Sequence, residues 1–254
     1  MALARGADVV CVAPATADFI ARSAHGRSDD LLTAVLLATE APVVVCPAMN
    51  HQMYLHPQTR ANLDHLEEAL DYRVAGPADG PLAHGEEEGP GRMIEPSEIL
   101  EHLGRALTAE GPLEGRRVIV TAGPTREPVD PVRFLSNRSS GRMGYALARA
   151  AWRRGAQVNL VSGPSELPDP VGVDLVRVET ADEMDDAVRE VLPSADVCIF
   201  AAAVSDYRPE RSHGQKIKRS STGDILDLTL RANPDIAGGT KELRPRGAVS
   251  VGFA

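Results

Sequence analysis

The sequence has 254 residues, of which 43% are apolar, and it carries a formal net charge of −9 with a pI near 5.3. This length fits one large or two small domains with a hydrophobic core, and the acidic balance excludes a general affinity for nucleic acid or an anionic membrane surface. No apolar run is long enough to cross a bilayer and the first residues lack a signal-peptide layout, so we expect a cytoplasmic protein.

The first half alternates short β-branched runs with longer helical patterns, at 7–13, 29–39, 42–48, 57–70 and 72–76. Continuous apolar strands separated by crossover helices predict a parallel sheet that is covered on both faces. A glycine- and proline-rich stretch with one helix follows, and a new strand then begins at residue 116. We place the boundary between about Thr108 and Gly115, which gives domains 1–110 and 115–254.

The second half repeats this alternation, with strands at 116–123, 157–163, 174–180 and 195–204 and helices at 141–155 and 181–193. Gly155 is predicted to cap the first of these helices at its C-terminus. The predicted fold class is α/β, with two Rossmann-like or flavodoxin-like three-layer domains and mainly parallel sheets. The chain opens on a strand expected to be central and ends inside a strand, so we expect it to belong to a longer parent chain.

The loop after strand 116–123 carries an expected anion site. Ser139, Ser140 and Gly141 place hydroxyls and free backbone N–H groups where a helix begins, and the helix dipole favours an anion there. An ordinary serine N-cap is the alternative. Four arginines in this loop favour phosphate, namely Arg126, Arg133, Arg138 and Arg142. Neither the Walker sequence nor the G-x-G-x-x-G dinucleotide sequence is present.

A second loop follows strand 195–204. Small residues at 201–203 allow a flat ring to approach closely, Asp206 can accept from a ribose or base or help to hold a metal ion, and Lys216 can neutralise phosphate charge. The alternative is a solvated group of cations comprising Lys216, Lys218 and Arg219. Two anion-binding loops in one domain favour a nucleotide.

In the first domain, small residues end two strands, with Thr16 and Asn50 at the edge of an expected shallow groove for a planar cofactor. The alternative is that Pro14 and Pro47 only terminate strands. The glycine-punctuated segment 80–93, which contains His84, is expected to be a loop that acts as a flap or is merely solvated.

The three cysteines lie in apolar runs and are expected to be buried reduced thiols, at positions 11, 46 and 198. The seven histidines show no paired spacing with cysteine that specifies zinc. The sequence therefore leaves any metal ligands undetermined.

These strings resemble the bifunctional coenzyme A biosynthesis family, which joins phosphopantothenoylcysteine decarboxylase to phosphopantothenate-cysteine ligase. The resemblance rests on "APATAD", "DDLLTAVLLAT", "PVVVCPAMN" and "GPGRMIEP" in the first half. In the second half it rests on "TAGPTREPVDPVRFLSNRSSGRMGYALA", "AAAVSDYRP", "QKIK", "NPDI" and "VGFA". They span nearly the whole chain in order.

For the ligase, the resemblance implies that CTP and Mg²⁺ activate the carboxylate of 4'-phosphopantothenate as an acyl-cytidylate, which the cysteine amine then attacks. It implies that Lys216 stabilises charge on the CTP phosphates and that Asn137 is needed to convert the acyl-cytidylate. The positions implied to hold CTP are Ala202, Asp206, Pro234, Asp235, Ile236, Ala237 and Phe253, with Phe253 against the base.

For the decarboxylase, the resemblance implies FMN near Pro14, Ala15 and Thr16, and a substrate carboxylate held by Asn50. His84 stands where the family has a proton-donating cysteine, and an imidazolium is a competent general acid. The family's catalytic histidine and flavin phosphate loop belong to a preceding segment that this sequence lacks, so we expect an incomplete decarboxylase site. Small-molecule partners and a homo-oligomer are also implied.

Two other readings stay open. One is an NAD(P)-dependent oxidoreductase, which the missing glycine sequence disfavours. The other is a non-catalytic flavin- or nucleotide-binding scaffold, which predicts binding without turnover.

Overall fold

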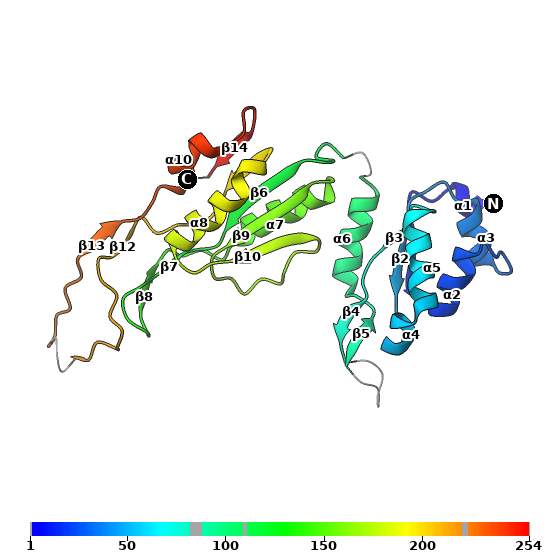
Figure 1. The fold of residues 1–254 in the computed structure, drawn as a ribbon, viewed down its shortest axis with the longest axis horizontal. Coiled ribbons are helices and arrows are strands. Elements are labelled where there is room, and N and C mark those ends of the chain that lie inside the picture. Colours follow the sequence, from blue (N-terminus) through cyan, green and yellow to red (C-terminus); the bar gives the residue numbers. More distant parts are fainter. Residues whose placement is uncertain (1, 82–87, 109–110, 220–222, 254) are drawn as a thin grey trace. The chain divides into compact units, whose positions relative to one another are not determined.

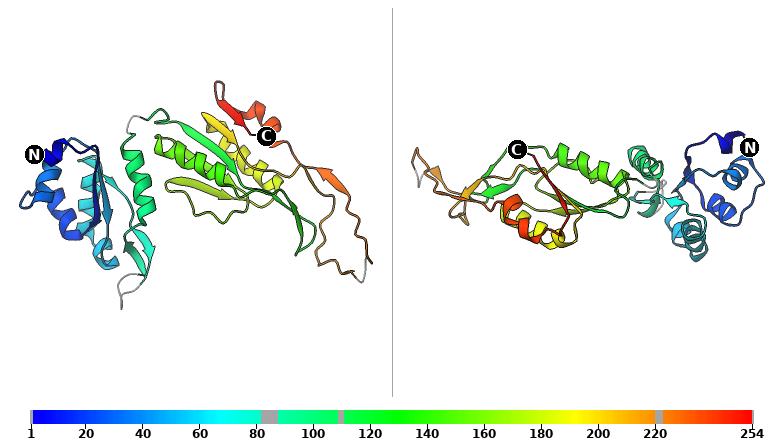
Figure 2. Two further views of the ribbon diagram at one scale, coloured as in Figure 1. Left: turned by 180° about the vertical axis from the view of Figure 1, so that it is seen from behind. Right: turned by 90° about the horizontal axis from the view of Figure 1, so that it is seen from above.

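The computed structural model describes residues 2–81, 88–108, 111–219 and 223–253. The chain divides into two compact units, Met1–Ala109 and Glu110–Ala254 (Figure 1). Each unit is an α/β structure with its own core, as Figure 2 shows from two further directions. Among the described residues, no helix is long and apolar enough to span a membrane.

The first unit alternates helices and strands along most of its length. Its elements are α1 Ala2–Arg5, β1 Val10–Ala15, α2 Ala17–Ala24, α3 Leu31–Ala38, β2 Val43–Pro47, α4 His51–Leu55, α5 Pro57–Glu68, β3 Arg73–Val74, β4 Ala78–Gly80, β5 Gly89–Arg92 and α6 Pro96–Ala106.

A parallel sheet in the order β1-β2-β3 forms the centre of the first unit. One face packs against α2 and α5 through Phe19, Ile20, Leu63 and Leu66. The other face packs against α6, where Ile99 and Ala106 meet the inner side chains of β2. The unit therefore has three layers, and every residue of β2 is buried.

The second unit begins with its central strand. Its elements are β6 Arg117–Ala122, β7 Arg126–Pro128, β8 Phe134–Ser136, α7 Arg142–Arg153, β9 Gln157–Ser162, β10 Val173–Arg177, α8 Ala181–Val191, η1 Leu192–Ser194, β11 Val197–Phe200, β12 Tyr207–Pro209, β13 Leu230–Ala232, α10 Ile236–Gly239, η2 Lys241–Leu243 and β14 Val249–Gly252.

Five parallel strands form the sheet of the second unit, in the order β10-β9-β6-β11-β14. Counted along the chain from β6, this is the order 3-2-1-4-5 of a doubly wound nucleotide-binding sheet. From β6 the chain first adds β9 and β10 on one side of the sheet and then adds β11 and β14 on the other side, so the strand order reverses between β6 and β11. Ligands of such sheets bind beyond the carboxyl ends of the strands at the point of reversal.

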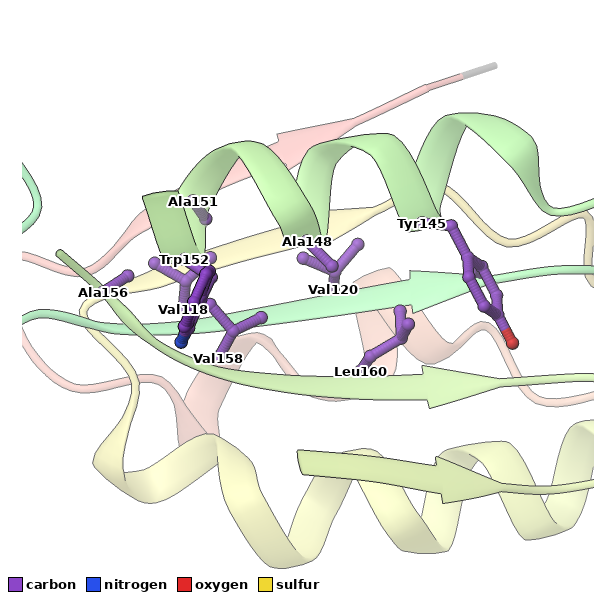
Figure 3. Close-up of a cluster of buried hydrophobic side chains, with 10 residues drawn as sticks. Val118, Val120, Tyr145, Ala148, Ala151, Trp152, Ala156, Val158 and Leu160 are labelled. Atoms are coloured by element: carbon purple, nitrogen blue, oxygen red, sulfur yellow. The ribbon is translucent and has the colours of Figure 1, made fainter. Parts of the chain in front are cut away.

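Helix α7 covers one face of this sheet, and α8 with α10 covers the other. Figure 3 shows Tyr145, Ala148 and Trp152 of α7 directed onto the valines and leucine of β6 and β9. Gly144 allows this close approach, because a Cβ there would lie 3.0 Å from the Thr121 carbonyl oxygen and would also meet the Ala122 side chain. The helix is thereby held against the carboxyl half of the central strand.

The α/β class with mainly parallel sheets is confirmed. Gly155 directly follows the C-cap residue Arg154 with a φ of +98°, a backbone conformation that glycine tolerates best.

The segment 80–93, expected to be a loop, begins and ends in β4 and β5, which pair as an antiparallel hairpin, and its centre at 82–87 lies outside the described residues. One expectation about the cysteines was wrong. Cys46 and Cys198 are buried free cysteines, but Cys11 is exposed because β1 lies at the edge of the sheet formed by the described residues, with β2 as its neighbour.

Candidate functional site

A cavity of about 280 Å³ lies at the carboxyl ends of β6, β11 and β14. The structure brings together in its lining all seven positions that the sequence resemblance associates with CTP: Ala202, Asp206, Pro234, Asp235, Ile236, Ala237 and Phe253. They come from the loop after β11, the N-terminal end of α10 and the residue after β14. Among the described residues no side-chain hydrogen bond or ion pair is found for Asp206, so its carboxylate can accept from a ligand.

Side chains from neighbouring strands hold the walls of this cavity in place. Thr121 Oγ1 accepts from the backbone N–H groups of Ala201 and Ala202, both at 3.2 Å. Asn233 Nδ2 donates to the Ser205 carbonyl at 2.7 Å, and Asn233 Oδ1 accepts from Arg208 at 2.9 Å. The loop after β11 is therefore attached both to β6 and to the segment that leads into α10.

A larger open cavity of about 1220 Å³ lies beyond β6, β9 and β10. Four arginines line it, from loop, helix and strand positions: Arg126, Arg138, Arg142 and Arg177. Arg126 also stacks on the Phe134 ring, with its guanidinium carbon 4.8 Å from the ring centroid. The same lining also holds three glutamates, Glu166, Glu179 and Glu183, and Arg177 pairs with Asp169. Arginine guanidinium groups in such a lining suit a ligand that carries phosphate.

The N-terminus of α7 opens onto this larger cavity. Its N-cap is Gly141, in a left-handed conformation, and no side chain caps the helix. Ser139 and Ser140 line the cavity, and Ser139 Oγ accepts from the Gly141 N–H at 3.3 Å. The alternative of an ordinary serine N-cap is therefore wrong, and the first-turn N–H groups have no side-chain cap to compete with an anion.

Asn137 connects the two cavities. It lines the larger one, directly after β8, and its Nδ2 donates to the carbonyls of Val204 at 2.9 Å and Ala203 at 3.4 Å. Val204 in turn lines the smaller cavity.

Lys216 lies on the arm between β12 and β13 and lines neither cavity. Its side chain is exposed, and we find no hydrogen bond or ion pair from it to another residue that the structure describes. The structure thus separates Lys216 from Asp206, which the sequence had placed in one cluster.

In the first unit, Thr16 and Asn50 stand at the carboxyl ends of the adjacent strands β1 and β2. Thr16 Oγ1 caps α2 by accepting from Phe19 N at 3.2 Å, and Asn50 Oδ1 caps α4 by accepting from Gln52 N at 2.9 Å. Pro14 is exposed and Ala15 is fully buried. The Thr16 hydroxyl proton and the Asn50 amide N–H groups remain available to a ligand.

His84 lies outside the described residues. Across the described ranges, no group of three or more histidine, cysteine, aspartate or glutamate side chains is arranged to hold a metal ion. This result is compatible with a divalent cation that is held by at most two carboxylates and completes its coordination shell with phosphate oxygens of a ligand.

Sequence reasoning missed Tyr145, Ser162 and Arg177, which also line the larger cavity. Tyr145 is buried in the first turn of α7, and Figure 3 shows its ring beside the carboxyl ends of β6 and β9. Ser162 and Arg177 end β9 and β10. Their place at the end of a predicted strand is the sequence signal that could have found Ser162 and Arg177, because ligands of parallel sheets bind beyond the carboxyl ends of the strands.

The structure is that of an α/β protein with cavities at the carboxyl ends of parallel strands. Residues 113–254 match the family model described as the DNA/pantothenate metabolism flavoprotein C-terminal domain, and residues 1–108 match the model described as flavoprotein. The chain belongs to the family of the DNA/pantothenate metabolism flavoprotein C-terminal domain.

The similarity to named relatives extends along the whole chain. The coenzyme A biosynthesis bifunctional protein CoaBC of Vibrio cholerae is 49% identical over 252 residues, and the protein of that name from Escherichia coli K12 is 46% identical over 253 residues. Each match covers 99% of this chain and 62% of the relative, so the chain spans less than two thirds of their length. These matches confirm the predicted family resemblance.

A crystal structure of the C-terminal domain of a coenzyme A biosynthesis bifunctional protein CoaBC is 43% identical to this chain, with a TM-score of 0.48. The match covers 56% of this chain and 65% of that one.

Proposed function

We propose that this chain serves coenzyme A biosynthesis, with a CTP-dependent phosphopantothenate-cysteine ligase site in its second unit and part of an FMN-dependent decarboxylase site in its first. The observation that carries the ligase assignment is the pair of cavities at the carboxyl ends of one parallel sheet, connected by Asn137. The relatives' names support the pathway.

The smaller cavity takes the cytidine part of CTP in this proposal. Phe253 offers a ring for the base, and Asp206 offers a free carboxylate to a ribose hydroxyl or a base amine. Asp235 is already occupied, since its Oδ1 accepts from Gly238 N at 2.8 Å as the N-cap of α10. We therefore assign Asp206 a direct contact with the cytidine, and we assign Asp235 a role in shaping the wall of the smaller cavity.

The larger cavity takes 4'-phosphopantothenate, with the phosphate among the arginines and the N–H groups of α7. The carboxylate oxygen then forms a bond to the α-phosphorus of CTP. The bond from that phosphorus to the β-phosphate oxygen breaks, and pyrophosphate leaves with the electron pair. In the second step the cysteine amine attacks the acyl carbon, loses a proton and displaces CMP.

Asn137 and Lys216 have different roles in these two steps. Asn137 stands between the cavities, where its amide holds the loop that the acyl-cytidylate must contact. Lys216 supplies a positive charge for the CTP phosphates during the first step. Mg²⁺ would be held largely by those phosphates.

FMN would be held in the first unit by residues at the ends of β1 and β2. Pro14 and Thr16 are exposed and carry small side chains, so a planar ring can approach the backbone at the end of β1, where Ala15 is buried. When bound, the flavin supplies the redox chemistry that makes loss of carbon dioxide possible. Asn50 is placed to donate its amide to the substrate carboxylate, and His84 is assigned the proton donation.

The test is pyrophosphate release with 4'-phosphopantothenate, cysteine, Mg²⁺ and CTP, run beside ATP and beside Lys216→Gln. We expect release with CTP, at least tenfold less with ATP, and a markedly slower but measurable release in the variant. Binding of CTP without release by a folded sample would favour the non-catalytic scaffold. Stabilisation by NAD(P) and not by CTP would favour the oxidoreductase.

A further inference from the structure

The arm that carries Lys216 is attached to the β7–β8 hairpin through one buried carboxylate. Asp130 lies in the turn of that hairpin, and its side chain is fully buried. Asp130 Oδ2 accepts from the Ile217 N–H of the arm at 3.0 Å. Figure 1 shows the hairpin and the arm running side by side.

Further contacts complete this attachment. Asp130 forms an ion pair with Arg133, and Arg133 Nη2 donates to the Ile217 carbonyl at 2.9 Å. His213 N donates to the Val129 carbonyl at 3.0 Å. Both polar groups of the Ile217 backbone are therefore held, immediately after Lys216. We call the set Asp130, Arg133 and Ile217 the arm clamp.

Asp130 is built to stay ionised. Its Oδ1 accepts from the N–H groups of Val132 and Arg133, both at 2.9 Å. The Arg133 guanidinium and these backbone N–H groups hold the pKa of Asp130 well below its usual range. The clamp consequently does not release with pH in any ordinary working range.

The same hairpin also carries Asn137. Strand β8 runs from Phe134 to Ser136, so only that strand separates the clamp residue Arg133 from Asn137. Ser136 Oγ donates to the Thr125 carbonyl at 2.7 Å and fixes that end of the hairpin. A displacement of the clamp would therefore alter the spacing of Lys216 relative to Asn137.

We propose that Asp130 is a positioning residue of the ligase, which sets the place of Lys216 through the Ile217 backbone. The proposal rests on the proposed function, because it gives Lys216 its role on the CTP phosphates. Asp130 itself touches no reacting atom. Asp130 reduces the backbone freedom of the arm before CTP binds. Less conformational entropy is therefore lost when the transition state forms.

The test compares four forms of the whole chain: wild type, Asp130→Asn, Lys216→Gln and the double variant. We expect Asp130→Asn to lower the rate of CTP-dependent pyrophosphate release at least tenfold, with KM for CTP changed less than threefold. The double variant should be no slower than Lys216→Gln alone, because Asp130 then has no lysine to position. Independent, multiplying losses would overturn the proposal, as would an unchanged rate in Asp130→Asn.

Two further variants separate positioning from folding. Ile217→Pro leaves Asp130 in place and removes the N–H that it holds, so it should reproduce the rate loss even if Asp130→Asn does not fold. Asp224→Asn is the matched control, because Asp224 pairs with Arg219 on the same arm with both side chains about 85% exposed. Its rate should stay within twofold of wild type.

Limited trypsin digestion examines the clamp without reference to activity. Cleavage after Lys218 should be several-fold faster in Asp130→Asn and Ile217→Pro than in wild type, and unchanged in Asp224→Asn. Equal cleavage in all four would overturn the clamp. If the wild-type chain releases no pyrophosphate with CTP, the proposed function is contradicted, whatever the digestion shows.

Discussion

The side-chain amide of Asn137 ties the lining of the larger cavity to the loop after β11. Its Nδ2 donates to two carbonyls that follow β11, so Asn137→Asp would place a carboxylate against carbonyl oxygens. Such a change replaces attraction with repulsion and loosens the loop after β11.

We predict that Asn137→Asp keeps pyrophosphate release within about threefold of wild type and lowers formation of the cysteine adduct more than tenfold. Quantifying both products in one reaction checks this. Equal loss of both products would show that Asn137 serves the first step as well.

His102 gives the first unit a pH-dependent stability. Burial, together with the nearby charges of Arg73 and Arg105, lowers the pKa of His102 to about 4 from an ordinary 6.5. The folded unit binds fewer protons than the unfolded chain between these values. The contribution of His102 to the free energy of unfolding is therefore fully present above pH 6.5 and is lost as pH falls towards 4. This contribution is about 3 kcal/mol at most.

We predict that the first unit loses stability across this range and that His102→Gln flattens the dependence. Unfolding followed by circular dichroism from pH 7 to 4.5 measures it. The effect of Asp30 is separable, because its pKa is lowered to about 2 by the Thr33 N–H and Arg22, so its contribution is lost only below about pH 4. A steeper slope in the variant would contradict the assignment.

At the scale of elements, the packing of α7 on β6 depends on the absence of a side chain at Gly144. A Cβ there would meet Ala122 and the Thr121 carbonyl, both in the central strand. The strand cannot yield without disturbing the core on both of its faces.

We predict that Gly144→Ala destabilises the second unit by about 1–3 kcal/mol, even though alanine has the higher helix propensity. Gly214→Ala is the control, because a Cβ at Gly214 meets no atom within 4 Å. Urea unfolding of both variants provides the measurement. Similar midpoints for both would show that the helix can shift away from β6.

Sequence periodicity predicted the elements best where one face is apolar. Helices α7 and α8 begin and end within a few residues of their predicted limits, and α8 has the Thr180–Glu183 capping box that marks its start. The hairpin β4–β5 was missed because its second strand reads Gly-Pro-Gly-Arg, a composition typical of a loop. It forms through backbone pairing between Ala78–Gly80 and Gly89–Arg92.

At the scale of the whole molecule, the single tryptophan offers a probe of one unit. Trp152 is buried in the core of the second unit, so its fluorescence follows the unfolding of that unit. Because CTP is proposed to bind there, saturating CTP should raise the midpoint of this transition.

We predict a rise of several degrees with CTP and Mg²⁺, and less than one degree with ATP or NAD, in thermal unfolding monitored by tryptophan fluorescence. At 100 times Kd the stabilisation is about 2.7 kcal/mol. Asp206→Asn should reduce the rise, whereas Asp227→Asn, an exposed acid on the arm that lines neither cavity, should not. A larger shift with NAD would contradict the nucleotide assignment.

The amino-acid sequence alone determined the α/β class, the strand and helix alternation and the loops that bear chemistry, because hydrophobic period and turn composition are local properties. Only the tertiary structure decided how those loops combine. It put the predicted CTP positions in one cavity, Asn137 and the arginines in another, and Lys216 on a separate arm tied to Asp130. These outcomes depend on strand order and on hydrogen bonds between residues as many as 87 positions apart, which no local pattern encodes.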